Sequence, residues 1–434
     1  MPGPPPSQSL RRYDWLAIGV CFMALGMTVV YPTARLAAGA LGDWATGTFS
    51  RSRGRAAIWN TIWMGFASVL CSGIVGTALA LFIARFRFPG RPVLAAMAYL
   101  PFALPPLVGT LSFYYLIGTD GFIPRSLERL GWDDASLEGG GAVLVIHTYS
   151  FFVFFYAMVS AALQNLDTSQ IEAARTLGAS PRRAFWKVTL PMLTPALVGA
   201  SLLTFMSSGA SFSAPLYFGD DFPFLSVVIY EARTQFNDAL AMSYTVVLAC
   251  ISLMGVAIFR SRRRHAVAAS KGTARPIRSQ GGRIAAGVLA WAVILMLLTP
   301  HLVIVLLSFA DHFEWHTELV PPQYTLANYT EIFTQYEHLR PVLNSLWMAF
   351  LGAIATVAVG LPAGYLIGRH RPGARLVNVL VMIPWALPGT VVAINLIAAF
   401  NDEWLPIYNT VWLLPIAYFV RSVPLLTRMS TAAI

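Results

Sequence analysis

The chain has 434 residues, of which 56% are hydrophobic and 12% are charged, and its mean hydropathy is +0.62. A soluble domain of this length cannot hide so much apolar surface, so the composition excludes an ordinary soluble protein and indicates that a lipid bilayer surrounds much of the chain. The net charge of +10 would suit a nucleic-acid-binding protein, but the placement of the charges argues against that class.

Ten apolar stretches recur along the chain, each about as long as the roughly 20 helical residues that cross a bilayer. They lie at residues 15–36, 57–84, 92–117, 141–163, 191–218, 244–259, 284–309, 344–367, 376–400 and 409–431. The first follows Arg11 and Arg12 and precedes small residues, as in a cleaved signal peptide, but its length favours an uncleaved anchor. The sequence therefore predicts an all-α polytopic membrane protein with about ten transmembrane helices.

The segments between these stretches differ in charge. If the N-terminus is cytoplasmic, most of the 30 Lys and Arg residues lie on the inner side, and all but three of the 20 acidic residues lie on the outer side. An excess of Lys and Arg on the cytoplasmic side is the positive-inside rule. We therefore expect a multi-pass protein with a cytoplasmic N-terminus.

Two patterns in the first part of the chain return in the last part. NTIWM at 60–64 reappears as NSLWM at 344–348, and PFALP at 101–105 reappears as PWALP at 384–388, at nearly constant offsets. Shared membrane composition alone would not keep Asn, Trp and Pro in this order. We predict two parallel repeats related by an axis along the membrane normal: a first half at 1–260 with six helices, and a second half at 284–434.

The segment between these halves, residues 261–283, reads SRRRHAVAASKGTARPIRSQGGR. It has no apolar periodicity, which predicts a flexible cytoplasmic linker. Basic runs bind nucleic acid in some proteins, but beside a membrane span we assign this one to topology and to attraction for anionic lipid headgroups. We expect the lipid bilayer as a partner and no nucleic acid.

The inner segment between the fourth and fifth spans, residues 167–191, carries the most informative motif. It contains, in order, Glu172, Ala173, Ala174, Gly178, Val188, Leu190 and Pro191. Asp167 or Thr168 can cap a helix over 169–177, and Gly178 can end it in a left-handed turn. A second short helix can start at Ser180, followed by proline in its first turn. We predict two short helices below the membrane, with a flat alanine surface suited to a cleft in another protein.

This pattern resembles the cytoplasmic coupling loop of ABC importer permeases, in which E-A-A is followed at fixed spacings by G, an aliphatic residue and L-P. The resemblance implies the MetI-like permease fold, a bacterial inner-membrane location and a loop that fits a cleft of a separate ATPase subunit. It assigns ATPase coupling to Glu172, Ala173, Ala174, Gly178, Arg182, Leu190 and Pro191. It also implies two ATPase copies and a periplasmic solute-binding protein as partners.

ATP is expected to bind to that ATPase. The chain has no G-x-x-x-x-G-K-[ST] phosphate loop, and neither Lys187 nor Lys271 follows a glycine. Its sequence also shows no Ser/His/Asp set, zinc-ligand spacing or paired carboxylates. We therefore expect no enzyme activity, no metal site and no cofactor in this chain, with ATP and Mg²⁺ held on the ATPase.

Two further segments, residues 88–118 and SFSAPLYFG at 211–219, resemble the iron(III) branch of these importers, as does the fused two-half layout. Branches for thiamine, aminoethylphosphonate and polyamines have similar proline-rich spans and stay open.

By the repeat, the second coupling loop falls past Ile434, so we expect the second half to be truncated before it. Two other classes of protein stay open. One is an ion-coupled secondary transporter, which would need acidic residues within its spans. The other is a membrane scaffold that only recruits an ATPase.

Six residues within the spans are candidates for the translocation pathway: Pro101, Pro105, Ser207, Ser211, Pro384 and Pro388. Proline breaks a helix where neighbours or a cavity satisfy the freed backbone groups, and serine lines a polar path or lets helices approach. Packing alone is the alternative for both. Four residues near span ends could bind a metal ion but are expected as interfacial anchors: Tyr114, Tyr115, His147 and Tyr149. Arg421, inside the last span, is either functional, directed at a partner helix or extended to the interface.

Overall fold

The computed structural model describes residues 12–41, 52–132, 135–166, 168–219, 221–260, 275–276, 279–311 and 320–434. Most of these residues are helical, which confirms the predicted all-α class. The helices are α1 (Arg12–Leu25), α2 (Tyr31–Leu41), α3 (Ser52–Arg85), α4 (Arg91–Met97), α5 (Pro106–Ile117), α6 (Phe122–Glu128), α7 (Gly139–Gln164), α8 (Thr168–Thr176), α9 (Pro181–Ala184), α10 (Leu190–Gly209), α11 (Ser213–Phe218), α12 (Leu225–Thr234), α13 (Asp238–Arg260), α14 (Gln280–Ser308), α15 (Ala327–Thr334), α16 (Tyr336–Gly368), α17 (Ala374–Ala386), α18 (Gly389–Phe400) and α19 (Leu413–Ala433).

Shorter elements join some of these helices. π-helical turns lie at Gly26–Val30 and Phe185–Thr189, and a 3₁₀ turn lies at Leu100–Ala103. Two strands, β1 (Phe86–Arg87) and β2 (Arg275–Pro276), pair in parallel with Phe86 opposite Arg275. Most of the predicted linker at 261–283 lies outside the described residues, and its last residues already belong to α14.

Within the described residues, seven helices are long and apolar enough to cross a membrane, and two bent helix pairs raise the number to nine. The predicted spans at 92–117 and 376–400 appear as bent helix pairs, as expected for spans whose prolines break the helix. The first pair bends by 104° before α5, and the second bends by 111° between α17 and α18. The tenth predicted span corresponds to α19, whose hydropathy is lowered by Arg421 and Arg428, so it does not count among the nine.

The two copies of the sequence repeat adopt the same local structure. α3 and α16, which carry the matching NTIWM and NSLWM segments, have 34 and 33 residues. Each is followed by a glycine with a left-handed backbone, Gly90 at φ +83° and Gly373 at φ +81°, and then by a bent pair. At the bends, Pro105 and Pro388 have the same φ of −56°. The predicted repeat is therefore present in the backbone conformation as well as in the sequence.

The contacts divide the chain into two compact units. Unit 1 comprises the described parts of Met1–Ser50, Ile229–Leu253 and Tyr329–Ile434, and unit 2 those of Arg51–Val228 and Met254–Asn328. Each unit draws on more than one stretch of chain. The predicted division into halves on either side of 261–283 stays a prediction.

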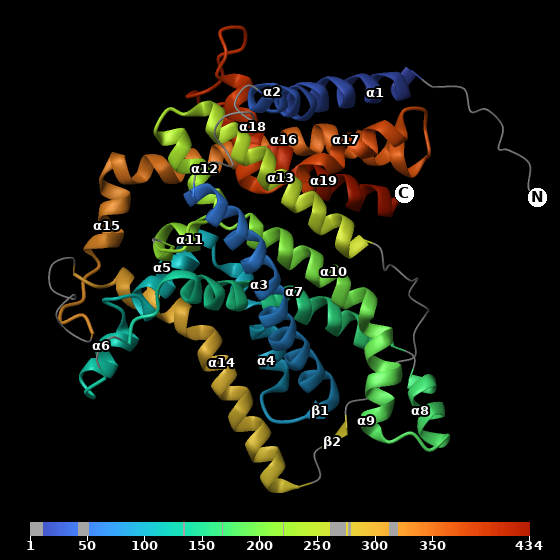
Figure 1. Cartoon of the computed structure of the whole chain (residues 1–434), viewed down its shortest axis with the longest axis vertical. Helices are drawn as coiled ribbons and strands as arrows, with labels where there is room; N and C mark the ends of the chain where they lie inside the picture. Colours follow the sequence, from blue (N-terminus) through green and yellow to red (C-terminus); the bar gives the residue numbers. More distant parts are fainter. Residues whose placement is uncertain are drawn as a thin grey trace, which may run out of the picture. The chain divides into compact units, whose positions relative to one another are not determined.

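Unit 2 is built around α3, which packs along α7 and α10 (Figure 1). The helices approach closely at Gly76, where an added Cβ would lie 2.3 Å from the Phe152 carbonyl oxygen. Small residues at such crossings let membrane helices gain van der Waals contact, because lipid gives them little hydrophobic reason to associate. Leu94, Val153 and Leu193 are fully buried in the core formed with α4 and α14.

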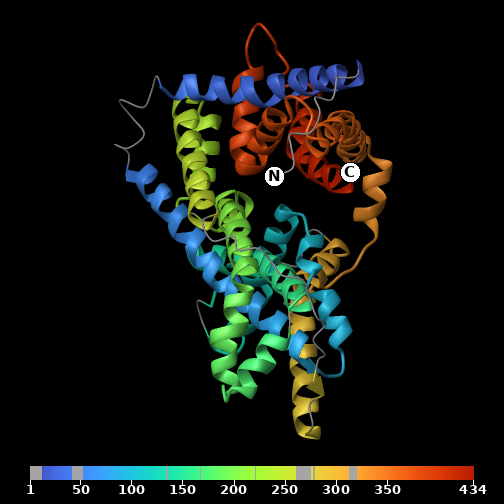
Figure 2. The ribbon, with the colours of Figure 1, turned by 90° about the vertical axis from the view of Figure 1, so that its right-hand side faces the viewer.

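Unit 1 is built around α16, which packs along α19 and also contacts α1 and α17 (Figures 1 and 2). Its close approach lies at Gly364, where an added Cβ would come within 2.7 Å of the Ser430 Cβ. Beyond the end of α16, Arg371 lies 3.6 Å from the Asp14 carboxylate. A hydrogen bond to Tyr365 and, secondarily, the Asp14 charge raise the pKa of Arg371, so this guanidinium stays charged.

Candidate coupling loop and membrane-embedded polar sites

Residues 168–191 form a helical hook, and α8 is its first arm (Figure 1). α8 ends in a left-handed turn at Gly178, where φ is +86°. The Gly178 N–H donates to the Arg175 carbonyl and the Ala179 N–H donates to the Ala174 carbonyl, each at 3.0 Å. These two bonds form a Schellman motif, which glycine favours because it has no Cβ to oppose a positive φ. The predicted glycine turn is confirmed.

The second arm of the hook begins at Ser180, whose side-chain oxygen accepts from the Arg183 N–H at 3.3 Å. α9 continues through the π-helical turn into α10, so Pro181–Gly209 is one span candidate. Pro191 has no N–H and its ring crowds the carbonyl one turn earlier, and the wider turn before it accommodates both effects. Ser180 is therefore confirmed as a cap, whereas Asp167 lies outside the described residues.

The hook presents most of the motif to its surroundings. Five of the seven coupling residues are exposed and two are half-buried: Glu172, Ala173, Gly178, Arg182 and Pro191, then Ala174 and Leu190. Leu177 beside the turn is 89% exposed, whereas Ile171 on the same helix packs against the core of unit 2. The hook is thus held on one side and offers an exposed leucine, a flat alanine and several cations on the other. Such a face suits a partner with an acidic, partly apolar cleft.

The four candidate pathway prolines lie at the two bends, each in its own unit. Pro101 is buried in the 3₁₀ turn and Pro105 is exposed at the start of α5, both in unit 2. Pro384 and Pro388 are buried on either side of the break between α17 and α18, in unit 1. The structure therefore places the prolines as pairs at equivalent positions of the repeat.

Arg421 provides hydrogen-bond donors for backbone carbonyls at the bend in unit 1. Its guanidinium donates to the carbonyls of Pro384 at 3.1 Å and Leu387 at 3.0 Å. These carbonyls are freed where the helix breaks, and a free carbonyl in a bilayer costs several kcal/mol. Of the expectations for Arg421, the structure favours a partner helix: the charge is directed at the broken helix and not at the membrane surface.

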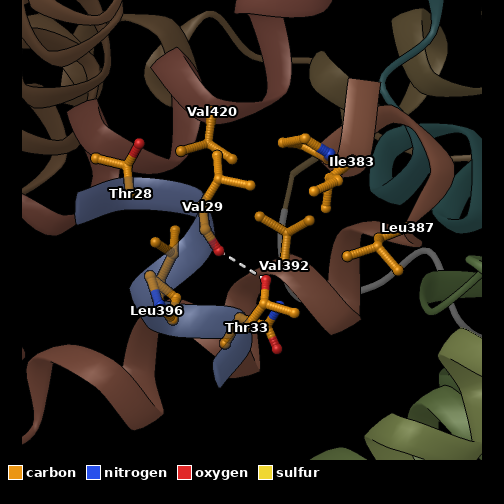
Figure 3. Close-up of a pocket in the computed structure, with 11 residues that line it drawn as sticks. Thr28, Val29, Thr33, Ile383, Leu387, Val392, Leu396 and Val420 are labelled. Carbon is orange, nitrogen blue, oxygen red and sulfur yellow. Dashed lines mark hydrogen bonds between the residues drawn. The ribbon is translucent and has the colours of Figure 1, made fainter. Parts of the chain in front are cut away.

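A small cavity lies beside the same bend (Figure 3). Its volume is about 10 Å³, close to the space that one water molecule needs. Thr33 lies at its rim and donates its hydroxyl to the Val29 carbonyl at 2.7 Å, and Asn395 lines it with its side-chain oxygen buried. The rest of the lining is mainly apolar, so the cavity is a small packing gap beside the bend.

The two candidate serines lie in the last turn of α10 and in the segment that follows it. Ser207 is half-buried in α10, and Ser211 lies in the break before α11, where its carbonyl accepts from the Ser226 hydroxyl. The neighbouring Ser208 is fully buried instead, and its hydroxyl lies 3.2 Å from the His147 Nδ1. Ser68 lies 3.0 Å from the same nitrogen.

His147 is therefore no interfacial anchor, and that prediction is wrong. The side chain is 1% exposed, and with Ser68 and Ser208 it joins α7 to α3 and α10 by hydrogen bonds. Tyr149 also lies within unit 2 and donates its hydroxyl to the Leu297 carbonyl of α14 at 2.8 Å. The positions of His147 and Tyr149 near a predicted span end suggested that they lie at the membrane interface. In the structure, the helices packed around α7 provide their hydrogen-bond partners. Among the described residues, no group of three His, Cys, Asp or Glu side chains is placed to hold a metal ion.

Comparison with known proteins places this geometry in a family. Residues 76–267, which include the hook, match the family described as the inner membrane component of binding-protein-dependent transport systems. A probable ABC transporter permease of Sinorhizobium fredii is 30% identical over 98% of this chain and 78% of its own length. The chain belongs to the ABC transporter permeases. The predicted resemblance and the MetI-like fold of a multi-pass inner-membrane protein are thereby confirmed.

The names of proteins similar to this permease give different substrates. A ferric transport system permease of Actinobacillus pleuropneumoniae is 26% identical over 85% of this chain, and the chain spans 55% of its length. A sulfate transport system permease of Escherichia coli is 30% identical over 45% of this chain and 71% of its own length. A solved bacterial ABC transporter that imports alginate matches 58% of this chain and 97% of its own at 19% identity, with a TM-score of 0.46.

Proposed function

We propose that this permease is the translocation subunit of an ABC importer, with its N-terminus and its hook in the cytoplasm. The hook would dock in a cleft of a separate ATPase subunit, of which two copies drive the importer, and a periplasmic binding protein would deliver the solute. The supporting observation is the exposed Glu172, Ala173 and Leu177 around a Schellman turn. Binding-protein-dependent transport, which the family description names, requires both kinds of partner.

Coupling through the hook is a shift of population between two arrangements of the helices. ATP binding favours one arrangement only if the ATPase contacts the hook differently in the two. Because α9 runs into α10 through a wide turn, movement of the hook is passed directly to a membrane span. The pathway residues lie at the bends, in α10 and just after it, and they stay proposals for the surface along which the solute moves: Pro101, Pro105, Ser207, Ser211, Pro384 and Pro388.

The docking proposal is tested by co-expression with a candidate ATPase subunit and co-purification of the two proteins. Arg182→Glu reverses the charge of an exposed hook cation, which should repel an acidic cleft and abolish recovery of the ATPase. Arg340→Glu makes the same change at an exposed position of α16 and serves as the control. Equal recovery with both variants, at equal amounts of folded permease, would refute docking through the hook.

For the substrate we propose ferric iron. The support is the similarity to ferric permeases over 85% of this chain, together with the proline-rich segments noted above. The sulfate permeases match a shorter part of the chain, and they make sulfate the second candidate. Cells expressing the whole transporter should take up radioactive ferric iron and not radioactive sulfate. Uptake of sulfate alone would replace the iron proposal and leave the docking proposal intact.

A further inference from the structure

A cavity of about 690 Å³ lies in unit 2 between the hook and the ends of α3, α4 and α7. Its volume falls within the roughly 300–1,000 Å³ of ordinary ligand pockets. α3 ends at Arg85 and α7 ends at Gln164, and both residues line the cavity. The cavity therefore lies where two membrane spans end, beside the hook.

The charged residues that line this cavity are all cations. Arg85 at the end of α3, Arg91 at the start of α4 and Arg175 on α8 contribute to the wall, and the lining, taken over the described residues, contains no Asp or Glu. Arg91 uses its Nε to donate to the Ile83 carbonyl at 2.8 Å, which fixes its stem and leaves the terminal amino groups for other acceptors. Three guanidinium groups around one space repel each other, and a bound anion offsets that repulsion.

The rest of the wall is largely apolar. Leu163 and Leu166 at the end of α7, Ile171 on α8 and Phe185 after α9 all face the same space. Leu166 is buried, and Leu163 and Ile171 pack against the core of unit 2. A free inorganic anion would use the arginines and leave this surface without a partner. A ligand with an anionic head and a hydrocarbon tail uses both.

We propose that this cavity binds an anionic phospholipid of the cytoplasmic leaflet. Its phosphate would be held by Arg85, Arg91 and Arg175, and an acyl chain would pack against Leu163 and Ile171. Basic pockets between membrane helices on the cytoplasmic side recognise anionic lipid headgroups in this way. Because Arg175 and Ile171 belong to the hook, the bound lipid would hold α8 against α3 and α7. The assignment to the cytoplasmic leaflet rests on the orientation given under the proposed function.

The test measures lipid binding to the full-length permease alone, in detergent, by native mass spectrometry. Phosphatidylglycerol should bind more tightly than phosphatidylcholine with the same acyl chains, and inorganic phosphate should not displace it. Arg85→Gln and Arg91→Gln should each weaken phosphatidylglycerol binding about fivefold, since a cation near a lipid headgroup contributes about that factor. Arg340→Gln removes a charge from an exposed position of α16 outside the cavity and should leave binding unchanged.

A second variant keeps every charge and fills the space. Ala84→Trp places a large ring in the wall of the cavity and should weaken phosphatidylglycerol binding while the arginines stay in place. Equal binding of the two lipids, displacement by inorganic phosphate, or unchanged binding in both Arg85→Gln and Arg91→Gln would each overturn the proposal. Because no ATPase is present, a failed docking experiment does not affect this result.

Discussion

Replacing Gly178 by alanine tests whether the hook must keep its left-handed turn in order to dock. Gly178 has a φ of +86°, and a Cβ added there would meet nothing within 4 Å. The substitution therefore creates no collision, and its cost comes from the backbone alone. An L-residue in the left-handed region costs roughly 1–2 kcal/mol.

This cost sets the expected loss of affinity. If the ATPase binds only the hook with its Schellman turn, the free chain must restore that turn before binding, and 1–2 kcal/mol corresponds to a roughly 5- to 30-fold weaker association. The value is an upper limit, because alternative turns that still bind would lower it. Gly178→Asn should fall between glycine and alanine, since asparagine tolerates the left-handed region better.

Gly131 supplies a matched control for the same substitution. It ends α6 with φ +83°, its N–H donates to the Glu128 carbonyl and the Trp132 N–H donates to the Leu127 carbonyl, so the turn has the same two bonds. A Cβ at Gly131 also meets nothing within 4 Å. Gly131→Ala thus carries the same backbone cost away from the hook. Titration of the purified ATPase onto each permease variant, followed by fluorescence anisotropy, measures the affinity. Equal affinities for Gly178→Ala and Gly131→Ala would refute the reasoning.

Three further predictions concern the membrane-embedded part and are measured by thermal unfolding in detergent. Arg421→Leu leaves two carbonyls at the bend without their donor and should destabilise unit 1 by about 1–3 kcal/mol or more, whereas a purely snorkelling arginine would tolerate the change. Gly76→Ala forces α3 away from α7 and should cost about 1–3 kcal/mol, while Gly19→Ala, in open space, should be neutral. His147→Phe removes the hydrogen bonds to two serines and should cost roughly 1 kcal/mol, since such bonds average about 0.6 kcal/mol in membranes.

Much of the fold and two local features of the hook, its glycine turn and its serine cap, could be predicted from the sequence, whereas its π-helical turn at Phe185–Thr189 could not. Apolar stretches of sufficient length must be helical in a bilayer, because no water is available for their backbone groups. The turn at Gly178 and the cap at Ser180 depend on hydrogen bonds that span only a few residues, so the residue types at these positions predict them. The repeated NTIWM and PFALP segments likewise predicted the paired bends in position, although the sharp angle at each proline was not foreseen.

The sequence by itself determined which segments enter the membrane and how the hook turns, because those features depend on hydropathy and on neighbours along the chain. Only the tertiary structure decided which polar groups meet. The partners of Arg421 lie 34 and 37 residues away, and those of His147 lie 79 and 61 residues away. The three arginines of the basic cavity come from three different helices. Helix packing sets such meetings, and no local pattern of residues encodes it.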